Sequence, residues 1–326
     1  MWKFIVKRLI MLIPVLIGVT LLVFLILQLA PGDPAKVILG EQATPEQIQE
    51  LRDSLGLNDP VLVQYANYII KLVQGDMGDS YKTRGPVSEE VFNRFPNTIK
   101  LTACAMLLAV VVAVPLGVVA AVKQNTLFDS ISMVIALIGV SMPIFWLGLL
   151  LILLFGRGVG LLDVFPSQGF PLDGWGAPGS AISALVLPAV SVGIIVGASL
   201  MRYTRAALGD LASSGYIDMA RSCGMTRTQA VLRVGLRLAT PQLVSVIGLT
   251  FASMVTGVMV IENLFALPGI GNGLVTDVGN RDLIAVQSEL FLLAAFFLTV
   301  GLVVDLLHRV LDPRLKTATA ITEVTA

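Results

Sequence analysis

Six long apolar stretches separated by polar segments dominate the pattern of the chain. They cover residues 9–29, 101–122, 131–155, 181–201, 243–261 and 284–304. A helix needs about 20 apolar residues to cross the hydrocarbon core of a bilayer, so each stretch has the length of one span or nearly so. The first five contain no charged side chain, and the sixth carries Glu289 near its start. The pattern predicts an all-α membrane protein with six transmembrane helices.

The composition supports this prediction. Of the 326 residues, 56% are hydrophobic and 13% are charged, whereas soluble domains carry about 25% charged residues. The first apolar stretch is longer than the roughly 7–15 residues of a signal-peptide core, and no small-residue cleavage site follows it, so we expect a retained span. Cys104 lies in an apolar stretch and Cys223 in a polar one, so we expect no disulfide between them.

Basic residues gather in three segments that six spans would place on one side of the membrane. Three precede the first stretch, three follow the last, and six arginines lie in the loop 202–240. The two short loops on the other side hold one arginine each. Because Lys and Arg in short loops favour the cytoplasmic side, both termini and the loop 202–240 are predicted to be cytoplasmic.

The spans divide the chain into four parts. Residues 1–30 hold the N-terminal tail and span one, 31–98 an extracytoplasmic insertion, 99–308 a five-span core, and 309–326 a cytoplasmic tail that we expect to be disordered. The insertion is polar and acidic. Thr44 and Pro45 are typical of a helix start, and residues 61–73 are amphipathic. We therefore expect a small helical insertion between spans one and two, with a disordered loop as the alternative.

Residues that enzymes use are scarce in this sequence. His308 is the only histidine, and it lies away from any activated-serine signature such as Gly-x-Ser-x-Gly, so no Ser-His-Asp triad can be assembled. No Cys/His cluster has the spacing of metal ligands. The phosphate-binding sequence Gly-x-x-x-x-Gly-Lys-[Ser/Thr] is absent, and the glycine-rich segment 269–273 is interpreted as a tight turn. We predict that the chain is not an enzyme and binds no cofactor or metal, and that any nucleotide is hydrolysed by another subunit.

The basic loop 202–240 has the signature of two short helices around a glycine. Residues 216–223 can form the first helix, which Gly224 would end. Thr226 can cap a second helix, 227–238, with Gln229 at its third position, and Pro241 would lie at the start of the fifth span. Such a knob on the cytoplasmic face could bind a partner, although its charge alone would also fit attraction to anionic lipid.

The core of this loop resembles the coupling motif of ABC-importer permeases, Glu-Ala-Ala-x-x-x-Gly. Asp218, Met219 and Ala220 are followed at the same spacing by Gly224, with Asp in place of Glu and Met in place of the first Ala. Residues 1–316 resemble the dipeptide/oligopeptide/nickel group of these permeases, specifically the first of its two paired subunits. The matching segments are residues 7–9 with Pro14 in the span, 30–34, 55–60, 75–80, 94–98, 141–146, 201–205, 215–217, 262–271 and 311–314. The segment 237–241 departs from the family pattern, which leaves the register between coupling helix and fifth span open.

The resemblance implies a subunit that forms half of a translocation pathway in the bacterial cytoplasmic (inner) membrane. Its implied partners are a second homologous permease, two cytosolic ATPase subunits that bind ATP and Mg, an extracytoplasmic substrate-binding protein and membrane lipid, with no nucleic acid. The implied cargo is di- or oligopeptides, with nickel, opine-like or glutathione-like solutes as alternatives. The alternative from another class is a stand-alone secondary transporter or channel, with Glu262 and Glu289 as its candidate relay groups.

The resemblance also implies residues that couple transport to the ATPases, on a short helix that would act as a lever. These are Tyr216, Asp218, Ala220, Gly224 and Arg227.

Two further sets complete the expected site residues. A proline in a span frees a backbone carbonyl that can line a cavity. We therefore expect pathway or gate residues around Pro143 in the third span, with ordinary helix packing as the alternative. These are Ser141, Met142, Pro143, Phe145 and Trp146. The segment that follows the fifth span, with residues 31–98, would contact the binding protein. Its candidates are Glu262, Asn263, Pro268 and Gly269.

Overall fold

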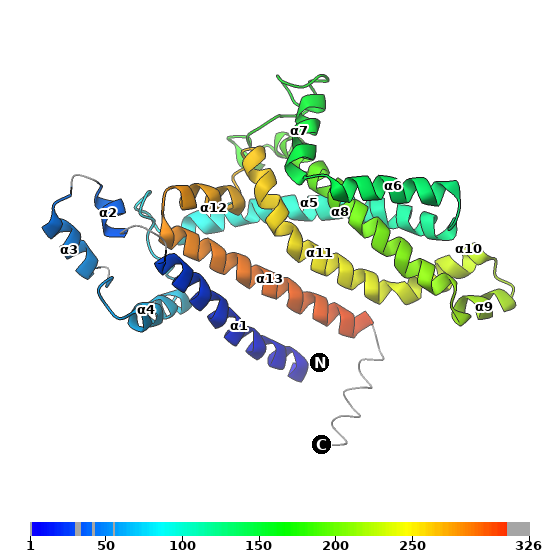
Figure 1. Cartoon of the computed structure of the whole chain (residues 1–326), viewed down its shortest axis with the longest axis horizontal. Coiled ribbons are helices and arrows are strands. Elements are labelled where there is room, and N and C mark those ends of the chain that lie inside the picture. The colour runs from blue at the N-terminus through cyan, green and yellow to red at the C-terminus, as the bar shows by residue number, and fades with distance from the viewer. Residues whose placement is uncertain (1, 30–33, 41–42, 55, 312–326) are drawn as a thin grey trace, which may run out of the picture. The chain divides into compact units, whose positions relative to one another are not determined.

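The computed structural model describes residues 2–29, 34–40, 43–54 and 56–311. Most of the predicted cytoplasmic tail, from residue 312 onward, lies outside these ranges, as do residues 30–33 of one family segment. The described part is built from α-helices and short helical turns (Figure 1), and it contains no strand beyond two isolated bridges. The all-α prediction is confirmed.

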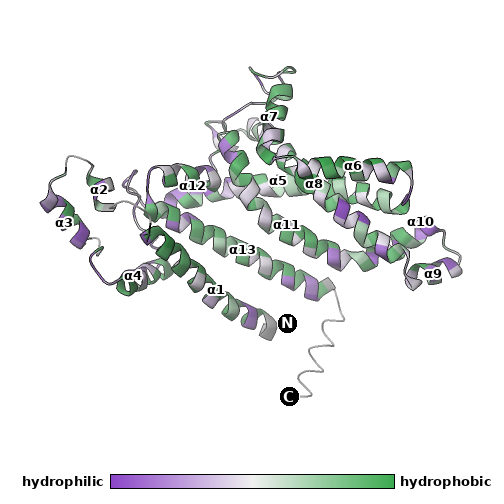
Figure 2. Cartoon of the chain, in the orientation of Figure 1, coloured by the Kyte–Doolittle hydropathy of each residue, from purple (hydrophilic) through white to green (hydrophobic). Residues whose placement is uncertain are grey.

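Five helices in the described part are long and apolar enough to cross a membrane. They are α1 (Trp2–Gln28), α5 (Val87–Val122), α8 (Pro178–Ala212), α11 (Leu236–Leu264) and α13 (Leu283–Leu311). Two shorter helices, α6 (Leu127–Ser141) and α7 (Ile144–Phe155), pass the same test only as a pair, and they are bent by 102° at the break between them. The third predicted span, residues 131–155, therefore corresponds to two helices joined at a sharp bend. Figure 2 shows how strongly apolar these helices are.

The chain forms two compact units. Unit 1 comprises residues 1–97 and 268–298, and unit 2 comprises residues 98–267 and 299–326. Each is described by itself below.

Unit 1 contains the short helices between α1 and α5, in the segment where the sequence predicts a helical insertion. Its helices are α1, α2 (Pro34–Leu39), α3 (Pro45–Ser54), α4 (Val61–Val73), α12 (Ile270–Gly279) and the first turns of α5 and α13. Thr44 caps α3 as predicted, because Gln47 N donates to its hydroxyl (3.3 Å) and Thr44 N donates to the Gln47 side chain (3.0 Å). These reciprocal bonds satisfy donors that the first helical turn leaves unpaired. The helix of the second span begins at Val87, inside the segment 31–98 assigned to the insertion.

The interpretation of residues 269–273 as a turn is wrong. Gly269 is the N-cap of α12, and the residues from Ile270 onward are helical. The reversal lies earlier, where Leu267 N donates to the Glu262 carbonyl (2.9 Å) and Ala266 has a φ of 50°. Within α12, Gly273 serves close packing and not a positive φ.

Unit 2 is organised around α8, which packs against α6, α7 and α11. Its main core joins Leu101 and Met106 of α5, Leu147 and Leu151 of α7, and Val258 of α11 to residues of α8. A close contact holds α5 against α8, since a Cβ on Gly117 would lie 2.7 Å from both the Met201 carbonyl oxygen and the Thr204 Cβ. The residues of α8 in this core, such as Leu185, Leu187 and Val192, are aliphatic, as expected for the buried face of a helix.

Candidate coupling site

The predicted first helix of the loop is α9 (Gly215–Ser222), which begins and ends one residue earlier than expected. Its inner face holds Ile217, 1% exposed, and Ala220, 7% exposed, against Ala230. Met225 and Val234 pack around this small core. An isolated helix of this length is unstable in water, so this packing fixes α9 in place.

The C-terminus of α9 has the hydrogen bonds of a Schellman motif. Gly224 N donates to the Arg221 carbonyl (2.9 Å), and Met225 N donates to the Ala220 carbonyl (3.3 Å). Gly224 has a φ of 92°, a conformation that favours glycine. The side chains of Met225 and Ala220 belong to the same apolar cluster, which is the contact that accompanies this motif. The Ala-x-x-x-Gly part of the sequence signature is therefore a helix stop.

The second predicted helix is wrong in its extent. Thr226 caps it as expected, with Gln229 N donating to the Thr226 hydroxyl (3.3 Å) and Thr226 N donating to the Gln229 side chain (3.1 Å). However, α10 (Arg227–Ala230) continues through the π-helical turn η2 (Val231–Gly235) into α11 without a break. Pro241 consequently lies inside α11. The segment that connects the two long helices is therefore shorter than the predicted loop 202–240, because it runs only from the end of α8 to the start of α10.

The outer face of α9 is open to solvent. Tyr216 and Met219 are 54% and 67% exposed, and the Asp218 side chain makes only a long contact with Arg221 (3.8 Å). An exposed pair of this kind contributes little to stability. The substitution of the family's first Ala by Met219 therefore falls on a position with no packing role within the chain.

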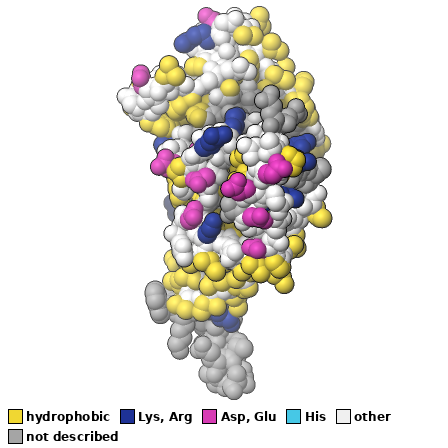
Figure 3. All heavy atoms as spheres, turned by 90° about the vertical axis from the view of Figure 1, so that its left-hand side faces the viewer, with side chains coloured by type: hydrophobic (Ala, Val, Ile, Leu, Met, Phe, Trp, Pro, Cys, Tyr) yellow, Lys and Arg dark blue, Asp and Glu magenta, His cyan; other side chains and the backbone are white. Residues whose placement is uncertain are grey.

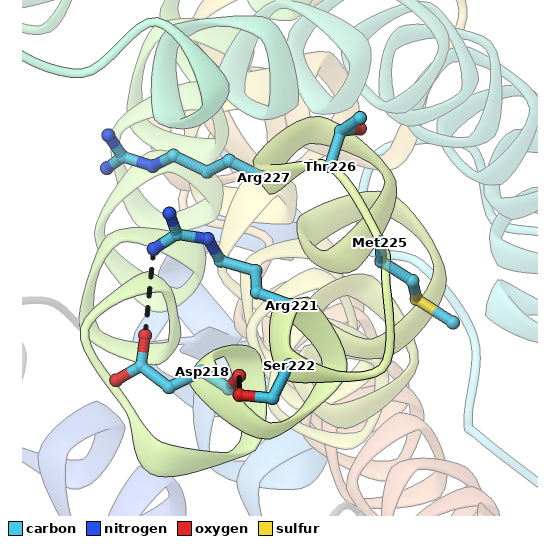
Figure 4. A pocket seen from close by; sticks show the side chains of 6 residues that line it. All are labelled: Asp218, Arg221, Ser222, Met225, Thr226 and Arg227. Carbon is cyan, nitrogen blue, oxygen red and sulfur yellow. Dashed lines mark hydrogen bonds and ion pairs between the residues drawn. The ribbon is translucent and has the colours of Figure 1, made fainter.

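A shallow hollow lies beside this face, with a volume of about 450 Å³. Figure 4 shows the guanidinium groups of Arg221 and Arg227 pointing to the same side, with Met225 pointing away from them. Its lining residues come from α9, α10 and the turn between them: Asp218, Arg221, Ser222, Met225, Thr226 and Arg227.

Of the five predicted coupling residues, the structure brings Asp218 and Arg227 together at this hollow and leaves Tyr216 exposed on α9. Ala220 and Gly224 build the fold of the segment. Sequence reasoning did not assign the other four lining residues to a site, although it predicted the helix stop at Gly224 and the helix cap at Thr226 that position them.

An ion pair ties α8 to the start of α6. Arg205 donates from Nε to Asp129 Oδ1 (3.0 Å) and from Nη2 to Oδ2 (2.7 Å), a two-point geometry that fixes both side chains. The carboxylate is 4% exposed and also accepts from Asn125 N. Arg205 lies seven residues before the end of α8 at Ala212, about 10 Å along the axis. The pair links the α5–α6 turn to the helix that leads into α9, at the same end of unit 2 (Figure 1).

The predicted pathway residues lie at the break between α6 and α7. Met142 and Pro143 are the connecting residues, and Ser141 donates from its hydroxyl to the Leu137 carbonyl (2.9 Å). Phe145 and Trp146 are 49% and 43% exposed. The predicted kink at Pro143 is confirmed. The angle of 102° between α6 and α7 is large enough to separate them into two helices.

Helix α7 is anchored to α11 on its other side. A Cβ on Gly148 would lie 2.6 Å from Leu264, and a Cβ on Gly257 would lie 3.3 Å from Ile144. These close approaches hold α7 in its bent position by packing.

The four residues predicted to contact a binding protein differ in exposure. Asn263 and Pro268 are exposed, whereas Gly269 is buried and Glu262 is 1% exposed. The Glu262 side chain is therefore buried, whereas a contact with another protein requires an accessible side chain.

Unit 1 holds a cluster of charged groups that sequence reasoning missed. Arg94 donates from Nη1 to Asp277 (2.7 Å) and to Glu289 (2.9 Å), and its Nη2 lies 3.2 Å from Glu90. Glu289 is fully buried, so pairing offsets part of the cost of removing its charge from water. A Cβ on Gly273 would lie 2.5 Å from Arg94 Nη1 and 2.6 Å from Glu289 Oε1. Glycine is needed there to leave room for the pair.

Another buried carboxylate, Asp282, holds the start of α13. Asp282 accepts from the Ser80 hydroxyl (2.5 Å) and from Ala285 N (3.2 Å), so it caps the helix. Burial, with the Asp282 charge as a second cause, raises the pKa of Tyr81 to about 12. The phenol therefore stays neutral in the physiological range. Among the described residues, no group of three or more His, Cys, Asp or Glu side chains could hold a metal ion.

Comparison with known proteins gives matches along nearly the whole chain. The family described as binding-protein-dependent transport system inner membrane component matches residues 113–317, and the N-terminal family of the same membrane components matches residues 1–102. A dipeptide transport system permease protein of Alkalihalophilus pseudofirmus is 37% identical over 333 residues, with 97% of this chain and 100% of the relative covered. The dipeptide transport system permease protein of Escherichia coli is 38% identical over 336 residues, covering 97% and 99%. The glutathione transport system permease protein of Escherichia coli is 39% identical over 316 residues, with the same coverage.

Proposed function

The chain belongs to the family of binding-protein-dependent transport system inner membrane components, and from this premise we propose that it forms half of the translocation pathway of an ABC importer for di- and oligopeptides. It works in the bacterial cytoplasmic membrane with both termini in the cytoplasm. The second half of the pathway is a homologous permease, and two cytosolic ATPase subunits bind ATP and Mg.

The observation that carries this proposal is the geometry of α9. Its inner face packs in a small core, a Schellman motif ends it, and a capping box starts the next helix. Tyr216, Asp218 and Met219 point outward with no packing role. A rigid, exposed helix of this kind fits a groove on a partner and transmits its motion. We propose that the partner is the ATPase and that Arg221 and Arg227 bind acidic groups beside that groove.

The Asp129–Arg205 pair supports a route from this helix to the pathway. Movement of α9 is passed to the end of α8, and the two-point bond passes it on to α6. Because packed elements switch between discrete arrangements, the break at Pro143 is where α6 changes its angle to α7. Ser141, Phe145 and Trp146 would then line or gate the pathway.

The opposite side of the membrane receives the substrate-binding protein in this proposal. Exposed carboxylates are frequent in residues 34–98, and Figure 3 shows acidic side chains gathered on one face of the molecule. The exposed acidic residues of this segment are Glu46, Glu50, Asp53, Asp59, Asp76, Asp79 and Glu89. Such a surface favours a partner with a basic patch through long-range attraction. Asn263 and Pro268 are the exposed candidates from the other predicted segment.

The cargo class rests on the relatives. The dipeptide and glutathione permeases match this chain at nearly equal identity, and glutathione is itself a small peptide. Short peptides are therefore the proposed cargo, with a glutathione-like solute as the second candidate. Calorimetric titration of the cognate binding protein with dipeptides, glutathione and nickel tests this part separately.

Reconstitution tests the proposal as a whole. The complete complex in proteoliposomes, supplied with the binding protein and a labelled dipeptide, should take up peptide only with ATP. An ATPase subunit without its catalytic glutamate is the matched control and should abolish uptake while leaving assembly intact. Uptake by this chain without any ATPase would contradict the proposal and favour a secondary transporter or channel.

A further inference from the structure

Helix α4 has two apolar faces, and its partners within unit 1 cover one of them. The half-buried face packs toward α1 and carries Tyr65, Tyr68, Ile69 and Leu72. The second face is exposed, although its residues are apolar and recur at helical spacings of four, four and three. They are Leu62, Ala66, Ile70 and Val73. A polar stripe made of Gln64, Asn67 and Lys71 occupies the remaining side.

The contacts of α4 lie along the second half of α1, a helix that is long and apolar enough to span a membrane. The Tyr65 hydroxyl bonds to the Thr20 hydroxyl (2.9 Å) and donates to the Ile17 carbonyl (2.9 Å). Phe24 packs on Tyr65 with ring centroids 5.5 Å apart, and Gln28 donates to the Gln64 side chain (2.8 Å).

These contacts extend well below the end of α1. The deepest of them is at Ile17, which precedes Gln28, the last residue of α1, by 11 positions. This separation is about 16.5 Å of helix at a rise of 1.5 Å per residue, and half of the hydrocarbon core is about 15 Å thick. The segment of α1 that α4 covers therefore corresponds to about one leaflet, and α4 shares that depth.

The length and exposure of α4 indicate which environment its exposed apolar face fits. Its 13 residues are too few to cross a bilayer, and apolar helices of about 10–14 residues are typically buried in a core or lie in the interface. Burial in the core of unit 1 is excluded, because Leu62 and Val73 are 78% and 82% exposed.

We propose that α4 is an interfacial helix that lies in the leaflet crossed by the Gln28 end of α1, with its second apolar face against phospholipid acyl chains. Asn67 and Lys71 turn toward the headgroups, where a lysine stem can extend to reach water. Lipid thus anchors the insertion between the first two spans, independently of the cargo and of the ATPase.

Spin labelling of the assembled complex in nanodiscs tests the proposal. Single cysteines replace Leu62, Ile70 or Asn67 in a background with Cys104→Ala and Cys223→Ala, and the nanodiscs contain phosphatidylethanolamine and phosphatidylglycerol. Collision of each label with oxygen, which concentrates in acyl chains, is compared with collision with a water-soluble nickel chelate. At positions 62 and 70 the oxygen rate should exceed the nickel rate, and at position 67 the order should reverse.

Two other results would overturn the proposal. A nickel rate equal to or above the oxygen rate at position 70 would show that the face lies in water. Low rates for both reagents with an immobilised spectrum would show that a protein, such as the binding protein or the second permease, covers it. A label at Ala66 provides a further position on the same face, and co-purification of the partner subunits shows that each variant is assembled.

Discussion

Replacement of Gly224 by valine is the sharpest single perturbation of the coupling segment. Gly224 has a φ of 92°, and a Cβ there would meet nothing within 4 Å. The effect of a side chain is therefore conformational and not a clash. A non-glycine residue in this region costs roughly 1–2 kcal/mol, and a β-branched one costs more because such residues are outliers there.

This cost falls on the Schellman motif that ends α9. A change of about 1–2 kcal/mol shifts an equilibrium by a factor of roughly 5–30, here toward a form of α9 without its C-terminal cap. The spans are not touched, so we expect normal membrane insertion. Peptide uptake should fall several-fold while ATP hydrolysis persists, because the ATPases would then turn over without moving the permease.

Uptake and ATP hydrolysis are measured on the same proteoliposomes. Gly215→Ala is the matched control, since Gly215 lies in the same helix with open space around its Cβ and no positive φ. Gly224→Asn should be the mildest change at the sensitive position, because asparagine tolerates the left-handed region, and Gly224→Ala should fall between asparagine and valine. Normal coupled uptake in Gly224→Val would refute the assignment of α9 as the coupling helix.

Three further predictions concern the packing that supports this mechanism. Gly273→Ala should lower the free energy of unfolding by about 1–3 kcal/mol through overpacking, whereas Gly279→Ala on the same helix, with open space around it, should not lower it; equal thermal shifts would contradict this. Alanine substitutions of Asp129 and Arg205, singly and together, should give a double-mutant coupling energy of at least about 1 kcal/mol, and additive losses would show that the pair carries no coupling. Pro143→Ala should favour a continuous helix by up to about 3 kcal/mol and reduce uptake without disrupting assembly, and unchanged uptake would exclude the break as a moving part.

The local signals in the sequence were sufficient for much of the fold. Apolar length predicted the long apolar helices, and the Thr44 and Thr226 caps lie where their side chains predicted them. Gly224 was predicted as a helix stop and is one. In each case the information lies within a few residues of the feature.

Features that depend on residues far apart in the chain were not predictable. Glu289 looked out of place in an apolar stretch, and its partner Arg94 is 195 positions away. The same holds for Gly273, whose role is to leave room for that pair.

One local signal was misleading. The second loop helix was predicted too short because Pro241 suggested a boundary, whereas the structure has this proline inside α11.

The central claim is that α9 docks on an ATPase, and a native thiol allows a direct test. Cys223 is free and exposed at the C-terminus of α9, and replacing Cys104 by alanine leaves it as the single cysteine. A photoreactive maleimide on Cys223 in the assembled complex should cross-link to an ATPase subunit, identified by mass spectrometry of the product. Cross-links to lipid alone, with the ATPase present in the complex, would contradict the account.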